Sequence, residues 1–262
     1  MQEGFAGING RKMYYKLLQP DLLQPDLPVL VFLHEGLGCV EQWKDFPQKL
    51  AERLGLPALL YDRLRYGRSD AWDQPFASDY LHREAFEVLP ALLHCLGITQ
   101  KLILVGHSDG GTIALLFAAK FPQRVLAVVS EADHVVNEPI TREGIQNTVK
   151  AYQEGMLKKQ LVRYHGAKTD DLFYGWSGFL LSPQGEQWNI LTELSQIRCP
   201  VLAIQGKKDV YGSIHQLGLK MQHIAADVNV LLLEDCGHIP HREKQATVIQ
   251  SIACFGEILQ CH

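Results

Sequence analysis

Short, nearly continuous apolar runs alternate along the chain with longer segments in which apolar residues recur every three or four positions. Runs of the first kind are typical of parallel strands buried on both faces, and segments of the second kind indicate helices with one buried side. The predicted strands are residues 29–34, 57–62, 101–106, 125–130, 201–206 and 228–234. The predicted helices are residues 41–54, 81–96, 110–121, 213–225 and 241–259. This alternation predicts an α/β fold with a doubly wound, mostly parallel sheet, whose ligands bind beyond the carboxyl ends of the strands.

Two stretches depart from this alternation. Asn9 and Gly10 lie between two short β-type runs, and this dipeptide is a strong hairpin signal, so we expect antiparallel strands at one edge of the sheet. Residues 135–195 break the rhythm, being polar in their first half and aromatic later. The aromatic residues are Tyr164, Phe173, Tyr174, Trp176 and Phe179. We interpret this segment as a mainly helical cap, inserted into a core formed by residues 1–134 and 196–262.

The composition narrows the classes of partner. The chain has 262 residues, of which 47% are hydrophobic, enough to bury the core of one main α/β domain. Its 25 basic and 29 acidic residues are interspersed and give a net charge of −4, which disfavours nucleic acid and anionic lipid as partners. The N-terminal segment lacks the apolar core of a signal peptide, and no apolar run has the length of a membrane span. We therefore expect a soluble, cytoplasmic protein that acts on a small molecule, and the sequence leaves its oligomeric state open.

One serine lies where a predicted strand gives way to a predicted helix. The stretch Gly106-His107-Ser108-Asp109-Gly110 fits the pattern GxSxG, whose glycines allow the sharp turn called a nucleophile elbow. Such a turn exposes the serine hydroxyl above the amino end of the following helix. The position between strand and helix makes an ordinary glycine-rich turn the weaker interpretation. We predict that Ser108 is a catalytic nucleophile.

A serine hydroxyl needs a base to remove its proton, and the base needs an acidic residue to orient it. After an elbow of this type, the two follow along the chain in the order Asp or Glu, then His. Asp209 and His238 follow the last two predicted strands, so both lie at the sheet edge that carries Ser108. We predict that Asp209 orients the base and that His238 is the base.

Other residues near this edge were weighed for the same roles. Glu131 and Asp133 follow the neighbouring predicted strand and are alternative acids. Among the eleven histidines, His107 is adjacent to the serine but faces away from it on an elbow. His223 lies within a predicted helix, and His241 and His262 have no strand end before them.

The negative charge that develops on the substrate oxygen requires backbone N–H donors. One donor is expected from Asp109, directly after the nucleophile, and the other from the loop after the first buried strand. That loop reads His34-Glu35-Gly36-Leu37-Gly38, and its glycines allow close approach of the backbone. We assign the second donor to Gly36.

Five motifs make the chain resemble the α/β-hydrolase family over essentially its whole length. They are HEGLG, YDRLRYGRSD, GHSDGG, QGKKDVYG and DCGHIPH, in the family's order and spacing. The resemblance implies the α/β-hydrolase fold with an inserted helical cap, and it implies a serine hydrolase of the small cytosolic esterase or C–C bond hydrolase branch. Within that branch, GHSDGG is similar to the biphenyl-hydrolase-like (valacyclovirase) enzymes. The chain departs from the family pattern at Glu35, where members usually have glycine, and at Leu64-Arg65, where they often have Arg-Gly.

These features predict a serine hydrolase that cleaves a small ester or related acyl substrate through an acyl-enzyme, without a metal or an organic cofactor. We expect Trp176, Phe173 and Phe179 either to cover the acyl pocket or to pack the cap's own core, and Glu35 to lie near the substrate. The carboxylate of Asp109 either pairs with a substrate ammonium, which would favour α-amino esters, or points to a neighbouring backbone amide or buried base.

Two other functions remain open at this stage. A C–C bond hydrolase acting on a vinylogous diketone uses the same triad, so only substrate tests separate it from an esterase. A ligand sensor on a hydrolase scaffold would keep these residues with little turnover. Dehalogenases and epoxide hydrolases of this fold use an aspartate nucleophile, and Ser108 argues against both.

Overall fold

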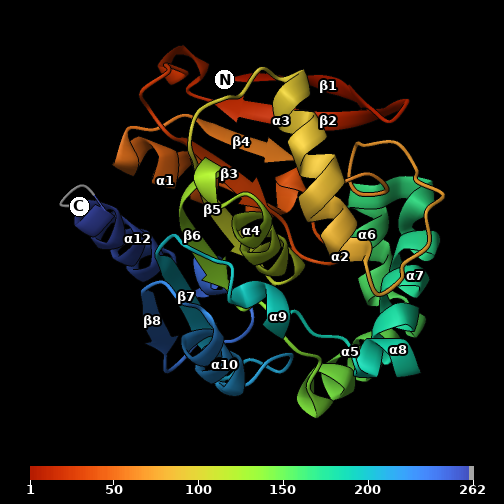
Figure 1. Ribbon diagram of the computed structural model, residues 1–262. Helices are drawn as coiled ribbons and strands as arrows, with labels where there is room; N and C mark the ends of the chain where they lie inside the picture. Colours follow the sequence, from red (N-terminus) through yellow and green to blue (C-terminus); the bar gives the residue numbers. More distant parts are fainter. Residues whose placement is uncertain (260–262) are drawn as a thin grey trace.

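A sheet of eight strands forms the centre of the molecule (Figure 1). The computed structural model describes residues 1–259, so His262 lies outside the described part. The strands are β1 (Gln2–Ile8), β2 (Arg11–Leu18), β3 (Val29–Leu33), β4 (Ala58–Tyr61), β5 (Leu102–His107), β6 (Val125–Glu131), β7 (Val201–Gly206) and β8 (Val228–Leu233). Their order across the sheet is β1-β2-β4-β3-β5-β6-β7-β8. Each predicted buried run forms one of these strands.

One edge of the sheet is antiparallel, and the rest is parallel. β1 and β2 form a hairpin in which Ile8 is opposite Arg11, and β2 pairs antiparallel with β4. Asn9 and Gly10 have φ angles of 52° and 75°, the left-handed values that a two-residue hairpin turn requires. The pairings from β4 across to β8 are all parallel. The predicted mostly parallel sheet with an antiparallel edge is therefore confirmed.

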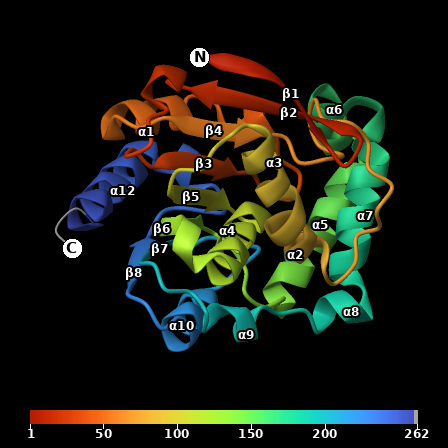
Figure 2. The ribbon, with the colours of Figure 1, turned by 45° about the horizontal axis from the view of Figure 1, so that its top comes forward.

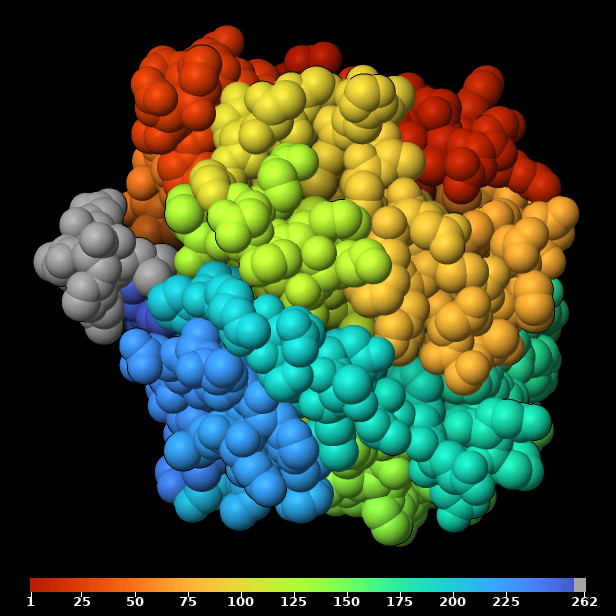
Figure 3. All heavy atoms as spheres, in the orientation of Figure 1, coloured from red at the N-terminus to blue at the C-terminus, as the bar shows by residue number. Residues whose placement is uncertain are grey.

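Helices cover both faces of the sheet because alternate side chains of a buried strand point to opposite sides. One face carries α3 (Leu89–Cys95), α4 (Asp109–Lys120), α9 (Leu191–Leu194) and α10 (His215–His223), and the other carries α1 (Phe46–Leu54) and α12 (Gln245–Leu259). In β3, Val29, Val31 and Leu33 contribute to the core under the first set of helices. Leu30 and Phe32 contribute to the core under the second set. Figure 3 views the first face, where α3 (yellow) and α4 (lime green) cover the sheet.

Three predicted helices are interrupted in the structure. The short elements that result are η2 (Val40–Trp43), α2 (Tyr80–Arg83), the π-helical turn η3 (Glu84–Val88) and α11 (Pro240–Glu243). Lys44, with a φ of 57°, separates η2 from α1, and Lys244, with a φ of −133°, separates α11 from α12. Pro90 follows the π-helical turn and has no N–H with which to continue a regular helical ladder. None of the helices in residues 1–259 is both long and apolar enough to cross a lipid bilayer.

A helical insertion between β6 and β7 covers the carboxyl end of the sheet, and Figure 2 shows α5, α6 and α7 side by side there. Its helices are α5 (Pro139–Gln153), α6 (Met156–His165), α7 (Thr169–Leu181) and α8 (Pro183–Glu186). The chain leaves and re-enters the core at a narrow neck, where Val136 pairs with Asn189 and the Ile190 N–H donates to the Val135 carbonyl at 2.9 Å. Since α9 follows the neck and packs against α4 and α10, the cap ends before the predicted boundary at residue 195.

Candidate active site

Ser108 occupies a strained turn between β5 and α4. Its φ of 53° and ψ of −121° are sparsely populated by non-glycine residues, and such a conformation costs about 1–3 kcal/mol. A Cβ on Gly106 would overlap the Gly110 carbonyl, and a Cβ on Gly110 would overlap the Leu33 carbonyl. The Ser108 N–H donates to the Glu131 carbonyl at 2.8 Å. The GxSxG glycines are therefore needed for close backbone packing, which holds the serine in this conformation.

His238 and Asp209 meet at the same edge of the sheet, on the loops after β8 and β7. The Nδ1 atom of His238 lies 2.9 and 2.8 Å from the two carboxylate oxygens of Asp209. This carboxylate also accepts the Tyr211 N–H at 2.8 Å and a Gln205 side-chain N–H at 2.7 Å. The bond to the carboxylate assigns the imidazole proton to Nδ1 and leaves Nε2 as the basic nitrogen. Ser108 and His238 line one cavity of about 190 Å³, which we call the catalytic cavity.

The surroundings keep His238 neutral and Asp209 charged near neutral pH. Burial lowers the pKa of His238 below its usual value, and the hydrogen bond to Asp209 offsets only part of this effect. Burial works to raise the pKa of Asp209, but the hydrogen bonds from His238 and the Tyr211 N–H outweigh it and lower that pKa. A neutral imidazole held by a carboxylate is the protonation state that a general base needs.

The two alternative acids have other partners. Glu131 faces His241, whose Nδ1 lies 2.9 Å from the carboxylate. Asp133 forms a salt bridge of 2.5 Å with Lys220, and both side chains are fully buried. These contacts engage both carboxylates at the end of β6, so the acid predicted from the loop after β7 is the one that the fold brings to the predicted base.

The loop after β3 carries Gly36 to the catalytic cavity. His34 is buried and joins this loop to its neighbour, because its Nε2 accepts the Arg63 N–H at 3.1 Å and its Nδ1 donates to the Glu35 carbonyl at 2.8 Å. Burial and the nearby Arg63 lower the pKa of His34 to about 3, so the ring is neutral. A Cβ on Gly36 would overlap the indole nitrogen of Trp176, which explains the glycine. The predicted oxyanion donor thus lies on a loop fixed by buried hydrogen bonds.

Apolar side chains of the cap form part of the cavity wall. Trp176 and Leu180, one turn apart on α7, line it together with Ile145 of α5. The indole N–H of Trp176 is buried and has no hydrogen-bond partner within the described chain. The part of the wall that the cap supplies is therefore mainly hydrophobic.

Phe173 and Phe179 are not part of this wall, which is one of the two arrangements that the sequence left open for them and Trp176. Phe173 is fully buried and stacks on Tyr152 of α5, with ring centroids 3.7 Å apart. Phe179 packs edge-on against Tyr80, with centroids 5.4 Å apart. Phe173 therefore packs the cap's own core, which is the second arrangement that the sequence left open, whereas Phe179 packs the cap against α2 of the core domain.

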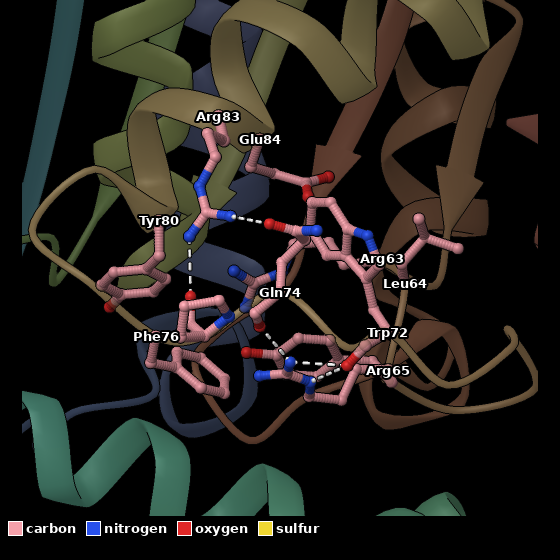
Figure 4. Close-up of a pocket in the computed structure, with 11 residues that line it drawn as sticks. Arg63, Leu64, Arg65, Trp72, Gln74, Phe76, Tyr80, Arg83 and Glu84 are labelled. Atoms are coloured by element: carbon pink, nitrogen blue, oxygen red, sulfur yellow. Dashed lines mark hydrogen bonds between the residues drawn. The ribbon is translucent and has the colours of Figure 1, made fainter. Parts of the chain in front are cut away.

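The carboxylate of Asp109 lies in a buried polar cluster rather than in the cavity wall. It accepts the Tyr80 hydroxyl at 3.1 Å and lies 3.7 Å from the Arg63 guanidinium and 3.9 Å from Nε2 of His134. Figure 4 shows Arg63, Tyr80 and Glu84 around the small pocket beside this cluster. Burial opposes ionisation, but His134 and Arg63 hold the pKa of Asp109 below its usual value. With 1% of Asp109 exposed, its carboxylate contacts a buried base, and a substrate ammonium is not its partner.

Glu35 lines the catalytic cavity and forms an ion pair with His107. Its side chain is 25% exposed, and a carboxylate oxygen lies 3.6 Å from Nδ1 of His107. The other ring nitrogen of His107 donates to the His238 carbonyl at 2.7 Å. Burial disfavours the charged form of both groups, but their pairing outweighs this effect. The pairing lowers the pKa of Glu35 to about 2 and raises the pKa of His107. Glu35 is therefore ionised and connects the oxyanion loop to the loop of the predicted base.

Sequence reasoning missed three polar residues of the site, which are Arg63, His134 and Tyr211. Arg63 donates to the Glu35 carbonyl at 2.8 Å, and Tyr211 packs on the His238 ring with centroids 4.7 Å apart. His134 and Tyr211 also line the catalytic cavity. All three follow the carboxyl ends of strands, and this position is the signal that could have found them. Within residues 1–259, no cluster of His, Cys, Asp and Glu is arranged to hold a metal ion.

Comparison with known proteins gives matches along most of the chain. Residues 28–183 match the family described as alpha/beta hydrolase fold. The chain is 33% identical over 250 residues to a proline iminopeptidase of Saccharolobus solfataricus, a match that covers 80% of this chain and 78% of the relative. It is 30% identical over 217 residues to the serine hydrolase BPHL of Homo sapiens, covering 78% of this chain and 69% of the relative. It is 26% identical over 235 residues to the 2-hydroxy-6-oxo-6-phenylhexa-2,4-dienoate hydrolase of Burkholderia cepacia, covering 80% of both.

Solved structures resemble the chain as a whole. MGS-M2, an alpha/beta hydrolase enzyme from a Medee basin deep-sea metagenome library, superimposes with a TM-score of 0.77 over 97% of both chains. Its sequence identity to this chain is 18%, so the likeness concerns the fold alone.

Proposed function

This chain belongs to the alpha/beta hydrolase family, and from that premise we propose that it is a serine hydrolase that cleaves a small ester through an acyl-enzyme. One observation carries the proposal: Ser108 on its strained elbow and His238, hydrogen-bonded to Asp209, line the same cavity. Gly36 lines this cavity as well, which supports convergence of nucleophile, base and oxyanion donors on one small volume.

In the proposed mechanism, Nε2 of His238 accepts the hydroxyl proton of Ser108 as the serine oxygen attacks the substrate carbonyl carbon. The N–H groups of Gly36 and Asp109 hold the oxyanion of the tetrahedral intermediate. The intermediate collapses as the imidazolium gives its proton to the leaving oxygen, and the acyl group stays on Ser108. A water molecule, deprotonated by the same imidazole, then attacks the acyl-enzyme and releases the acid. Asp209 remains ionised throughout and stabilises the imidazolium.

The shape of the catalytic cavity supports a small, largely apolar acyl group. Its volume of about 190 Å³ is below the roughly 300–1,000 Å³ of pockets that enclose drug-sized ligands. Trp176, Leu180 and Ile145 offer apolar contacts to the acyl chain. We expect acetyl to butyryl esters to be better substrates than long-chain esters.

Ser108→Ala tests the proposal directly. The variant should lose labelling by a fluorophosphonate and should lose turnover of p-nitrophenyl butyrate by at least about 1,000-fold, because the triad acts as a unit. Ser195→Ala is the matched control, since Ser195 is exposed and its hydroxyl contacts only its sequence neighbours, donating to the Thr192 carbonyl and accepting from the Gln196 side chain. Circular dichroism checks that both variants fold. Labelling that persists in a folded Ser108→Ala protein would disprove the assignment of the nucleophile.

A second candidate is hydrolysis of a carbon–carbon bond, which is favoured by the 26% identity to the dienoate hydrolase of Burkholderia cepacia. The same triad serves both reactions, so the site geometry alone does not separate them. A panel that contains p-nitrophenyl esters, that relative's named substrate and proline p-nitroanilide ranks ester, carbon–carbon and amide cleavage by kcat/KM. Preference for the dienoate over every ester would replace the first candidate by the second.

A further inference from the structure

A second, larger cavity lies next to the catalytic cavity. Its volume is about 780 Å³, and it is bounded by α5 and α6 of the cap and by the core loops near η2, β7 and α11. The two cavities share five lining residues, which are Glu35, Leu37, Thr148, Tyr211 and Ile239. We call it the outer groove, and its position makes it the place where the part of a substrate remote from the acyl group would lie.

Three basic side chains from separate segments line the outer groove. They are Lys44 after η2, Arg163 on α6 and Arg242 on α11. All three are exposed, and none of them forms a salt bridge within residues 1–259. The ammonium of Lys44 donates to the Tyr164 hydroxyl at 3.2 Å, which is a neutral partner. The groove therefore gathers three cations whose charge no described carboxylate neutralises.

Beside the three cations, the groove lining holds one carboxylate, and two further carboxylates next to Lys44 and Arg242 have other partners. Glu35 is the carboxylate in the groove lining, and it pairs with His107. Glu243, next to Arg242, accepts the backbone N–H groups of Gly237 and Ile239 at 2.7 and 3.0 Å. Asp45, next to Lys44, forms a salt bridge of 2.7 Å with Lys49. With three cations and one carboxylate in its lining, the groove is locally positive in a chain whose net charge is −4.

We propose that the outer groove binds an anionic group, a carboxylate or a phosphate, on the leaving-group side of the substrate. The inference rests on the proposed function, because it places the acyl group in the catalytic cavity and the remainder of the substrate in the groove. The amide side chains of Asn147 and Gln160 also line the groove and can donate hydrogen bonds to such an anion. The enzyme then selects esters by two separate criteria, which are a small apolar acyl group and an anionic alcohol.

The kinetic test uses butyrate esters of para-substituted phenols whose leaving groups differ in charge. They are 4-(butanoyloxy)benzoate, its neutral carboxamide, and 4-(butanoyloxy)phenyl phosphate, which separates carboxylate from phosphate recognition. The measured quantity is the kcat/KM of an anionic ester divided by that of the carboxamide. Lys44→Gln, Arg163→Gln and Arg242→Gln should each lower this ratio about 1.5- to 5-fold, and the triple variant about 3- to 100-fold, as expected for exposed charge pairs. The ratio should also fall in 0.5 M NaCl because salt screens these pairs.

Lys159→Gln is the matched control. Lys159 is an exposed cation on the same helix as Arg163 but does not line the groove, so its removal should leave the ratio unchanged. A ratio that the three groove variants leave unchanged would overturn the proposal. A fall of equal size in Lys159→Gln would also overturn it, because the effect would then come from the net charge of the protein.

A binding measurement separates failure of this proposal from failure of the proposed function. Calorimetry on the Ser108→Ala protein compares 4-hydroxybenzoate with 4-hydroxybenzamide and needs no turnover. Tighter binding of the acid that is lost in the triple variant supports the groove even if no ester is hydrolysed. Equal binding of the acid and the amide, together with Ser108-dependent ester hydrolysis, overturns the groove and leaves the proposed function intact.

Discussion

The Asp209→Asn substitution replaces a carboxylate that accepts three hydrogen bonds beside the predicted base, His238. The carboxylate accepts hydrogen bonds from His238 Nδ1, from the Tyr211 N–H and from the Gln205 side chain. An asparagine keeps the shape, but its NH₂ group donates, so at least one of the three donors would face another donor. The Tyr211 N–H is fixed by the backbone, whereas the imidazole can move its proton to Nε2. That tautomer cannot accept a proton from Ser108.

The expected loss follows from this tautomer. When the orienting aspartate of a serine triad becomes asparagine, kcat falls about 10³- to 10⁴-fold, which is about 4–5.5 kcal/mol of transition-state stabilisation. The fold should survive, because losing one charge-assisted hydrogen bond costs about 1.5–3 kcal/mol, or about 3–5 °C in Tm for a chain of this length. The Asp209→Asn variant should therefore lose most of its activity while it keeps most of its stability.

The assay measures kcat with p-nitrophenyl butyrate, and thermal unfolding by circular dichroism. Glu131→Gln is the matched comparison, because Glu131 is also a buried carboxylate that faces a histidine, His241, at 2.9 Å. Its kcat should stay within 10-fold of the wild type. An Asp209→Asn enzyme with more than a tenth of wild-type kcat, or a larger loss in Glu131→Gln, would refute the assignment of the acid.

Two further outcomes follow from the same geometry. Burial lowers the pKa of His238, and the reaction needs the neutral imidazole. The acidic limb of the kcat/KM profile against pH should therefore have its midpoint below pH 6.5. A midpoint above pH 7 would contradict this reasoning. Gly110→Ala should lower the free energy of unfolding in urea by about 1–3 kcal/mol, since the new Cβ overlaps the Leu33 carbonyl. Gly218→Ala, in the middle of α10 with nothing near the new Cβ, should raise it by about 0.5–1 kcal/mol, and equal effects of the two substitutions would refute the packing argument.

The sheet and the elbow could be predicted because their signals are local. A run such as residues 201–206 is mostly apolar and buried on both faces, and this pattern is typical of a buried parallel strand. Ser108 could be predicted from its glycines, because each has a backbone carbonyl where a Cβ would lie. His238 and Asp209 could be predicted because both follow strand ends, and their hydrogen bond of 2.8 Å joins them at the same edge.

The cavity walls could not be predicted in the same way, because they depend on contacts between distant segments. Leu180 and Phe179 are neighbours on α7 and similar in hydrophobicity, yet one lines the catalytic cavity and the other packs on Tyr80. The rotation of the helix about its axis decides between them, and that rotation is set by packing against the core. The carboxylate of Asp109 is another such case, since its partner Arg63 comes from the end of β4.

The neck at Val136 and Asn189 makes the cap an insertion that is connected to the core at one place along the chain. Because β6 and β7 pair directly with each other, the sheet closes without any contribution from the residues between the two neck positions. Ser108, His238 and Asp209 all lie outside that insertion. The cap meets this core at defined contacts, such as Trp176 against Gly36 and Thr141 against the Tyr211 carbonyl, so changes elsewhere in α5 to α8 are expected to leave Ser108, His238 and Asp209 in place.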